Sequence, residues 1–342
     1  MYPTFSLQKS LTCLQSTLLD WVAAIFALPL GQCDTDVRRV DLILHNICLC
    51  ASQVDAELAE LATIEDADRL LDGEDNQRWR RDFMRQFNRE DMSALALHRL
   101  TPSLISKRFE HEEVDHLEFV RQNTTIPVPR IHQAPCGWPV MDFIEGEMLC
   151  LCWDRLSPLM QFRVACTMRL YVKQLRGIKR DTVGRLKSGR VGGLICEWGE
   201  YDPFETAGHF ARFCEYITFS FWRAKRVPVA PGGIRLMRPQ IDWTPVFTHG
   251  DLNSSNILLD RRGTLWILDW GTAGFYPRSM ESFCTSVTDD SCNLAPSWYR
   301  RYHRFVYDSN EEEYAFWAWF HANMAQVCSG TIDIASRNYY EL

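Results

Sequence analysis

The residues His249–Asp260 read HGDLNSSNILLD, and the run ILDWGTAG follows at residues 267–274. Aliphatic residues alternate on both sides of a three-residue turn, RRG, which predicts a hairpin of two paired strands. A polar loop leads into the first strand, and Asp269 ends the second strand. The hairpin is therefore expected to place Asn256 and Asp269 at its open end, with Asp251 in the loop before it.

These three polar residues are of the types that phosphoryl transfer needs. A carboxylate orients the attacking hydroxyl and accepts its proton, while separate oxygen ligands hold Mg²⁺ on the nucleotide phosphates. Magnesium binds a few hard oxygen donors and keeps several waters, so one amide carbonyl and one carboxylate suffice. The pattern predicts Asp251 as the catalytic base, and Asn256 and Asp269 as metal ligands. The alternative is a polar loop between two strands, with a helix cap.

The segment HGDLNSSN followed by LDWGTAG resembles the aminoglycoside phosphotransferase and choline kinase family. HGD stands where protein kinases have HRD, and DW stands where they have DFG. The runs NTTIPVPRIH, FIEGEML and DWGTAGFYP resemble the large fungal branch of this family in particular, and the similarity covers roughly residues 93–290. The resemblance implies a small-molecule kinase that uses ATP and Mg²⁺ to phosphorylate a hydroxyl group of its substrate.

The pattern along the chain predicts an α+β fold in two lobes, and the resemblance implies that this bilobal fold is protein-kinase-like. Residues 1–90 have helical spacings and predict an N-terminal helical extension. Residues 91–144 combine short strands with one helix, as expected of a kinase-like N-lobe and hinge. Residues 145–342 are mostly helical and contain the hairpin, as expected of a C-lobe with its catalytic loop. The expected layout is a small β-sheet lobe with one helix, beside a larger helical lobe.

The fold that the family implies needs a strand lysine that contacts the nucleotide phosphates, and a helix glutamate that holds this lysine. Lys107 ends the strand-like run SLISKRF. Glu113 shares a helical face with Leu117 and Val120, where a carboxylate needs a partner. Lys107 and Glu113 are therefore predicted to bind the nucleotide. Charged neighbours compete for these roles: Arg108, Glu112 and Glu118.

The run VMDFIEGE resembles the hinge between the two lobes of the family. The resemblance implies that backbone groups hold adenine there, namely the carbonyl of Asp142 and the N–H of Ile144, with Met141 beside the ring. An ordinary edge strand is the alternative. The resemblance also implies that His249 shapes the catalytic loop, and we expect Glu281 to serve in packing.

The segment before Lys107 departs from the kinase pattern. Residues 87–103 contain no glycine, whereas a loop that covers phosphates normally has glycines, because backbone N–H groups must approach closely. This departure, with the extra N-terminal helices, supports a second hypothesis, a non-catalytic kinase-like binding module.

The acceptor cannot be identified from the sequence. Acids between residues 197 and 205 could attract a cationic acceptor, or they could form a solvated entry to the next helix, with Asp202 as its cap. A protein acceptor is not expected, because nothing resembles a kinase activation segment with its APE end.

Composition excludes several classes of protein. A formal net charge of −7 argues against binding to a nucleic-acid backbone. The 13 cysteines have irregular spacing and form no CxxC pair, so we expect buried thiols in a reducing, cytoplasmic compartment rather than a zinc site.

Asp20 interrupts the first apolar run, which predicts a buried or docking helix rather than a signal peptide. The piece Trp21–Leu30 is too short to span a membrane. The sequence does not indicate an oligomeric state.

Overall fold

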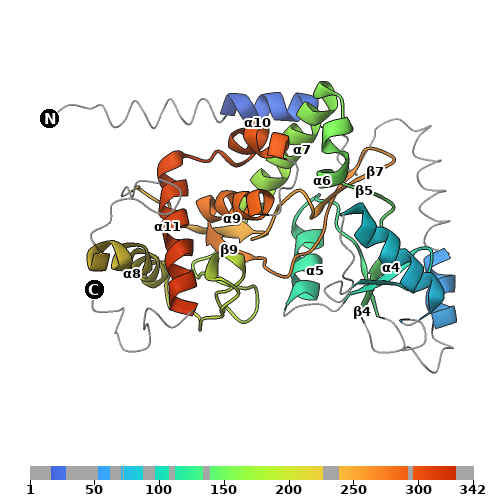
Figure 1. Cartoon of the computed structure of the whole chain (residues 1–342), viewed down its shortest axis with the longest axis horizontal. Coiled ribbons are helices and arrows are strands. Elements are labelled where there is room, and N and C mark those ends of the chain that lie inside the picture. The colour runs from blue at the N-terminus through green and yellow to red at the C-terminus, as the bar shows by residue number, and fades with distance from the viewer. Residues whose placement is uncertain are drawn as a thin grey trace. The chain divides into compact units, whose positions relative to one another are not determined.

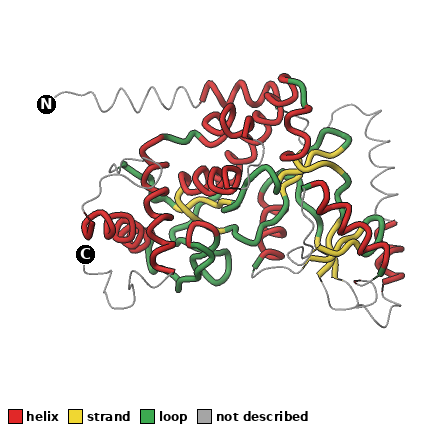
Figure 2. Tube along the Cα trace, viewed as in Figure 1, coloured by secondary structure: helices red, strands yellow, loops and turns green. Residues whose placement is uncertain are grey.

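The computed structural model describes residues 17–27, 53–61, 71, 73–87, 97–107, 112–133, 139–225, 239–291 and 296–328. The chain forms two units. The large unit contains residues 1–28, 152–257 and 272–342, and the small unit contains residues 29–151 and 258–271. Figure 1 labels several elements of each unit, and Figure 2 distinguishes helices, strands and loops. Asp251 thus belongs to the large unit, whereas Lys107 and Asp269 belong to the small unit.

The small unit contains the antiparallel sheet that the sequence predicts before and after Lys107. Met141 pairs with Ile105 on one side and with Ile131 on the other, so its strand is central and not an edge strand. The turn Thr101–Ser103 joins the first two strands, as its proline predicts. The strands lie in the order β1-β2-β4-β3, with the bounds β1 (Leu97–Arg99), β2 (Leu104–Lys107), β3 (Ile131–Gln133) and β4 (Pro139–Asp142).

Two helices of the small unit lie where the sequence predicts them. Helix α4 (Glu74–Gln86) covers most of the run QRWRRDFMRQF, and helix α5 (Glu113–Asn123) follows β2. The buried residues of α5 recur at spacings of three and four, which places them on one face. They are Glu113, His116, Leu117 and Val120.

The predicted hairpin is present as β7 (Ile257–Asp260) and β8 (Leu265–Ile267), and β5 (Gly146–Met148) pairs with β7. Asp260 forms the turn, because its carboxylate accepts hydrogen bonds from the backbone N–H groups of Arg262 and Thr264, both at 2.8 Å. Asp260 is thus a turn residue despite its position next to the catalytic motif. Asn256 directly precedes β7, and Asp269 is the second residue after β8.

A helix of the N-terminal extension, at residues 53–61, contributes to the core of the small unit. Leu61 is buried together with Leu104 of β2 and Val140 of β4. The carboxylate of Glu57 accepts hydrogen bonds from the backbone N–H and hydroxyl of Ser103, both at 3.1 Å, and from the hydroxyl of Thr101. The extension is therefore attached to the β1–β2 turn through both apolar and polar contacts.

The large unit is mostly helical, as predicted, with one pair of antiparallel strands. In Figure 1, α9 lies close to this strand pair, and α11 packs against α9 and α8. Aromatic rings fill much of the core, including those of Phe213, Trp317 and Phe320. The strands are β6 (Pro245–Thr248) and β9 (Gly274–Pro277). The longer helices are α7 (Pro158–Gly177), α8 (Ala207–Lys225), α9 (Arg278–Ser291), α10 (Pro296–Tyr307) and α11 (Glu311–Cys328). Short helices are α6 (Leu149–Cys152), η1 (Trp153–Arg155) and η2 (Leu194–Cys196).

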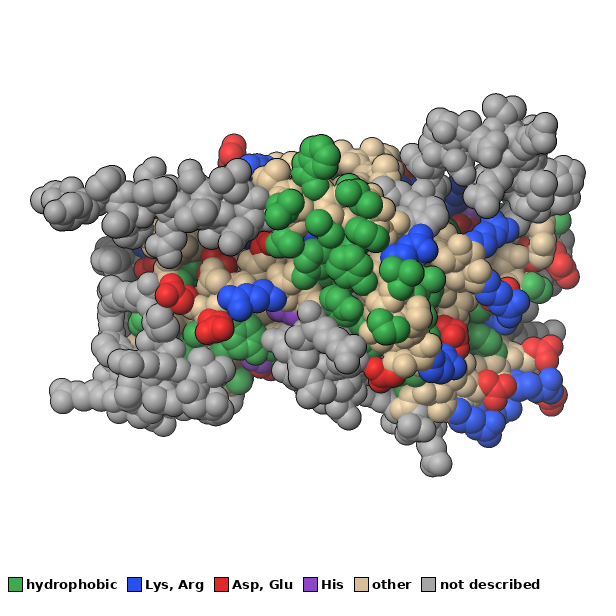
Figure 3. All heavy atoms as spheres, turned by 90° about the horizontal axis from the view of Figure 1, so that it is seen from above, with side chains coloured by type: hydrophobic (Ala, Val, Ile, Leu, Met, Phe, Trp, Pro, Cys, Tyr) green, Lys and Arg blue, Asp and Glu red, His purple; other side chains and the backbone are tan. Residues whose placement is uncertain are grey.

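The first described helix, at residues 17–26, docks on α7 of the large unit. Asp20 forms ion pairs with Arg169 at 2.9 Å and with Lys173 at 2.7 Å. The opposite face exposes large apolar side chains, including Leu18 and Trp21, and Figure 3 shows apolar side chains gathered on the face seen there. The predicted docking helix is confirmed for these residues, while residues 28–30 lie outside the described part. None of the described helices has the length and apolar content needed to cross a bilayer.

The α+β composition and the two-unit organisation are confirmed. The last two helices, α10 and α11, are separated at Asp308, which has a left-handed backbone with φ 49°. The division at residues 90 and 144 into an extension, an N-lobe and a C-lobe stays a prediction.

Candidate active site

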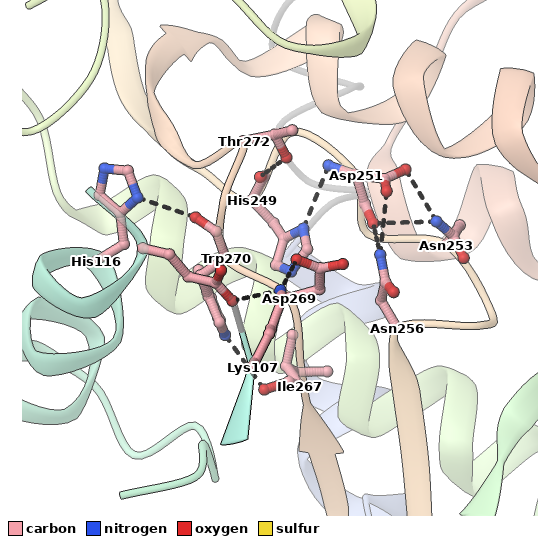
Figure 4. A network of polar contacts seen from close by, with 11 residues as sticks. Lys107, His116, His249, Asp251, Asn253, Asn256, Ile267, Asp269, Trp270 and Thr272 are labelled. Carbon is pink, nitrogen blue, oxygen red and sulfur yellow. Dashed lines mark hydrogen bonds and ion pairs between the residues drawn. The ribbon is translucent and has the colours of Figure 1, made fainter. Parts of the chain in front are cut away.

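The carboxylate of Asp251 is held in one orientation by neutral donors of the large unit (Figure 4). Its Oδ1 accepts hydrogen bonds from Asn253 Nδ2 and Thr288 Oγ1, both at 2.9 Å. Its Oδ2 accepts one from Asn256 Nδ2 at 3.1 Å. A carboxylate fixed in this way is positioned in advance to orient a substrate hydroxyl, as a general base requires.

The side chain of Asn256 is oriented by the same contact. Its Nδ2 also donates to the backbone carbonyl of Asp251 at 2.8 Å, so both donated bonds point to that residue. Within the described residues, the Oδ1 of Asn256 accepts no hydrogen bond. This oxygen is a hard donor of the kind that Mg²⁺ prefers, so Asn256 suits the predicted role as a metal ligand, which stays a prediction.

Glu281 of α9 holds the backbone of the catalytic loop. Its carboxylate accepts hydrogen bonds from the N–H groups of His249 at 2.5 Å and Gly250 at 3.1 Å. Burial raises the pKa of Glu281 to about 7, although these N–H groups and Arg176 act in the opposite direction. The expectation that Glu281 serves in packing alone is therefore incomplete, because it is a polar anchor of the loop.

His249 and Gly250 have the conformations that the loop needs. The Nδ1 of His249 accepts a hydrogen bond from the N–H of Asp251 at 3.2 Å, and its carbonyl accepts one from Thr272 at 2.9 Å. Gly250 has φ 80°, and a Cβ atom there would lie 2.6 Å from the carbonyl oxygen of Thr272. Only glycine fits this position without a shift of the backbone. His249 thus shapes the loop, as the resemblance implies.

The sequence did not single out most of the residues through which α9 contacts this loop. Thr285 donates to the carbonyl of Leu252 at 3.1 Å, and Asp289 accepts from the N–H and the hydroxyl of Ser254 at 3.1 and 2.7 Å. Glu281 and Thr288 contact the same loop, as described above. The four polar residues of α9 therefore recur at i, i+4, i+7 and i+8, which places them on one helical face. This spacing is the sequence pattern from which a polar face on α9 could have been predicted. The residues are Glu281, Thr285, Thr288 and Asp289.

In the small unit, Lys107 forms ion pairs with two carboxylates (Figure 4). Its Nζ lies 2.8 Å from Glu113 Oε1 and 2.5 Å from Asp269 Oδ1. The side chain of Glu113 is 1% exposed and that of Asp269 is 50% exposed. Burial would lower the pKa of Lys107, but the charges of Asp269 and Glu113 outweigh burial and raise it. The expected pair of Lys107 and Glu113 is therefore present, while nucleotide binding by these residues stays a prediction.

The hinge segment begins at the end of β4. The carboxylate of Asp142 lies 2.7 Å from His132 Nε2, and the N–H of Phe143 donates to the carbonyl of Ser103 at 2.7 Å. The N–H of Ile144 donates to no group in the part of the chain that the structure describes, so it is available for a ligand. Adenine binding by Met141, Asp142 and Ile144 stays a prediction.

The acids near residue 200 are paired within the large unit. Thr206 Oγ1 accepts from the N–H of His209 at 3.1 Å at the start of α8, so Asp202 is not the cap of this helix and that expectation is wrong. Each acid lies near a basic side chain: Glu197 at 3.0 Å from His321, Glu200 at 2.6 Å from Arg185, Asp202 at 3.8 Å from Arg190, and Glu205 at 3.5 Å from His209. The arginine pairs at Glu200 and Asp202 leave less negative charge for a cationic acceptor than the sequence indicates.

The chain combines two α+β units with sequence motifs that are typical of phosphoryl-transfer enzymes. The sequence pattern of the phosphotransferase enzyme family matches residues 66–320. The chain belongs to this family, and membership supports phosphotransferase activity. The protein-kinase-like fold that the resemblance implies follows from this membership, and assignment to the fungal branch stays a prediction.

Several solved structures are similar to this chain at low identity. An aminoglycoside phosphotransferase, APH(4)-Ia, is 12% identical with a TM-score of 0.42, covering 69% of this chain and 83% of the other. The ADP-bound aminoglycoside phosphotransferase APH(2'')-Ib is 12% identical with a TM-score of 0.37, covering 64% and 77%. Choline kinase LicA from Streptococcus pneumoniae is 15% identical with a TM-score of 0.31, covering 72% and 86%. No curated protein matches the sequence.

Proposed function

We propose that this protein transfers the terminal phosphoryl group of ATP to a hydroxyl of a small molecule. The observation that carries the proposal is the position of Lys107 between a buried carboxylate, Glu113, and a half-exposed one, Asp269. An ammonium group held by a buried partner is fixed in place to contact phosphate oxygens. The second carboxylate can then bind a metal ion beside the same phosphates.

The two units contribute different groups to this chemistry. In the small unit, Lys107 and Glu113 would bind the phosphates, and Asp269 would be a ligand of Mg²⁺. In the large unit, Asn256 would supply a second ligand oxygen, and Asp251 would accept the proton of the attacking hydroxyl. Magnesium, when bound, neutralises charge on the phosphates. The donors suit it, because an amide carbonyl and a carboxylate are both hard oxygen ligands.

Adenine would be held by the backbone at the end of β4. A central strand fixes Met141 and Asp142. The N–H of Ile144 has no acceptor in the described part of the chain, which supports a hydrogen bond to the base. Recognition through the backbone places few demands on side chains. The adenine-binding groups themselves therefore leave little side-chain signature in the sequence.

The proposed location is the cytoplasm. Cys166, Cys196, Cys214 and Cys284 are buried thiols, as expected of cysteines that serve as small apolar residues in a reducing compartment. Burial raises the pKa of Cys196 to about 12 and that of Cys166 to about 11. These thiols are therefore unreactive at neutral pH and behave as small apolar residues.

The proposal is tested by incubating the protein with labelled ATP, Mg²⁺ and a panel of small alcohols, aminoalcohols and sugars, and measuring label transfer. The variant Asp251→Asn keeps the size and shape of the side chain, removes the base and replaces one of the two acceptor oxygens with a donor. We expect its turnover to fall by about 10²- to 10⁴-fold on any acceptor found. An Asp251→Asn protein as fast as the parent would show that the base is assigned wrongly.

Binding of ATP in the absence of any acceptor separates this proposal from a non-catalytic binding module. A ligand that binds the folded state must raise the melting temperature. If millimolar ATP with Mg²⁺ produces no shift, the glycine-free segment before Lys107 does not support nucleotide binding, and the binding module is the better description.

A further inference from the structure

His116 is a fully buried polar residue of the small unit that the proposed chemistry does not use. It lies one helical turn after Glu113 on the same face of α5 and has no exposed surface. Its Nδ1 lies 2.9 Å from the backbone carbonyl oxygen of Trp270 (Figure 4). A carbonyl oxygen only accepts hydrogen bonds, so the Nδ1 carries the proton. The carboxylate of Glu112 lies 3.9 Å from the other ring nitrogen.

The carbonyl that His116 contacts belongs to the residue directly after Asp269. Asp269 has a left-handed backbone with φ 64°, which is uncommon for a residue other than glycine. Such a conformation persists where the surrounding contacts determine it. The indole N–H of Trp270 donates to the carbonyl of Ile267 at 3.2 Å, and Lys107 contacts the Asp269 carboxylate. The hydrogen bond from His116 holds the backbone on the C-terminal side of Asp269, at the Trp270 carbonyl.

Helix α5 therefore contacts the Asp269 segment by two routes. One runs through side chains only, from Glu113 to Lys107 to the Asp269 carboxylate. The other is direct and ends on the backbone, from the His116 ring to the Trp270 carbonyl. The side-chain route passes through a flexible lysine, whereas an imidazole ring is rigid. The backbone route thus acts on the main chain beside Asp269, whereas the side-chain route acts on the carboxylate itself.

We propose that His116 is a positioning residue that fixes the backbone at Asp269 and Trp270, and so prepares the Asp269 carboxylate to bind the Mg²⁺ of the nucleotide. This inference rests on the proposed function only for the metal, because the fixing of the backbone is testable without any ligand. Residues that orient a metal ligand from outside the coordination shell typically change metal affinity by about 10- to 100-fold when they are replaced.

Two substitutions separate this role from plain packing. The amide nitrogen of asparagine is two bonds from Cβ, as the Nδ1 of histidine is. His116→Asn therefore keeps a hydrogen-bond donor at this position. His116→Leu places a methyl group there and leaves the Trp270 carbonyl without its donor. Leucine is also the better helix former, so any loss cannot come from helix propensity. Val120→Ala, buried on the same face of α5, controls for general destabilisation.

The first measurement is hydrogen exchange of the backbone amides in a peptide spanning residues 268–272, without ligand. We expect exchange about tenfold faster in His116→Leu than in the parent, with His116→Asn close to the parent and Val120→Ala unchanged in this peptide. If His116→Leu and the parent exchange alike, or if His116→Asn behaves like His116→Leu, the inference is wrong.

The second measurement is the Mg²⁺ concentration that gives half-maximal phosphoryl transfer. We expect it to rise by about tenfold or more in His116→Leu, and to stay near the parent value in His116→Asn. An active parent whose Mg²⁺ requirement is the same in His116→Leu would contradict the inference alone. A parent that neither binds nor hydrolyses ATP would contradict the proposed function, and hydrogen exchange would still decide whether His116 fixes the backbone.

Discussion

Glu281 and Gly250 show how single residues fix the catalytic loop. Glu281 offers a buried carboxylate to two consecutive N–H groups, and Gly250 provides the left-handed backbone that brings these groups together. Asp251 is the next residue, so its position follows from both. Two predictions belong to this scale.

The first prediction concerns the pH dependence of stability. The pKa of Glu281 rises from 4.5 to about 7 on folding because the carboxyl is buried. A carboxyl with a raised pKa contributes stability that is fully present below its ordinary pKa and is lost as the pH rises through about 7. Glutamine is neutral at every pH and lacks this dependence. Between about pH 5 and pH 8 the parent should therefore lose on the order of 3 kcal/mol relative to Glu281→Gln.

This difference is measured by urea unfolding of both proteins at the two pH values. Other titrating groups affect both proteins equally and cancel, including His303, whose pKa is lowered to about 4 by burial. A parent and a variant whose stabilities differ by the same amount at both pH values would contradict the assignment.

The second prediction concerns the glycine. Gly250→Ala forces a Cβ atom to within 2.6 Å of a backbone oxygen at a left-handed position, so the loop must shift. We expect a loss of about 1–3 kcal/mol in the free energy of unfolding and a large loss of activity. Gly177→Ala is the matched control, because nothing lies within 4 Å of the added atom at the end of α7. It should be neutral or slightly stabilising, and equal melting temperatures for the two variants would argue against the strain.

At the scale of elements, the N-terminal helix at residues 53–61 acts as part of the small unit. Its apolar residues pack on β2 and β4, and Glu57 accepts hydrogen bonds from the turn between β1 and β2. The strand β2 runs from this turn to Lys107. The helix thus supports the strand that carries the proposed phosphate-binding residue.

This arrangement predicts that Glu57→Ala destabilises the small unit. Removing the carboxylate takes away the charged acceptor of the partly buried donors of Thr101 and Ser103, at a cost of roughly 1–3 kcal/mol in the free energy of unfolding. Asp55→Ala, on an exposed position of the same helix, should change stability little. Burial would raise the pKa of Glu57, but its hydrogen bonds outweigh burial and lower the pKa. The stability that Glu57 contributes should therefore be present above its ordinary pKa and should be lost as the pH falls below it. Thermal unfolding at neutral and acidic pH tests both statements.

At the scale of the whole molecule, the proposed roles are divided between the two units. The residues proposed to bind the phosphates lie in the small unit, and the proposed base lies in the large unit. Lys107→Met should therefore remove most of the rise in melting temperature that Mg²⁺ and ATP produce. Asp251→Asn should keep this rise while losing turnover. At a nucleotide concentration of about 100 times Kd, the parent should gain roughly 2.7 kcal/mol in the free energy of unfolding.

The two variants serve as controls for each other, because each removes one charged side chain and affects a different step. Loss of the nucleotide-induced shift in Asp251→Asn as well would mean that binding and catalysis are not divided in this way.

Local patterns in the sequence determined the fold class, the hairpin β7–β8, helix α5 and the pairing of Lys107 with Glu113. Each of these depends on residues close in the chain, where periodicity, turn residues and motif spacing are informative. The contacts of Glu281 with His249, of Glu57 with Ser103 and of His116 with Trp270 join residues far apart in the chain. Only the tertiary structure decided them, because a polar residue on a helical face looks the same in sequence whether it faces water or a backbone group of another segment.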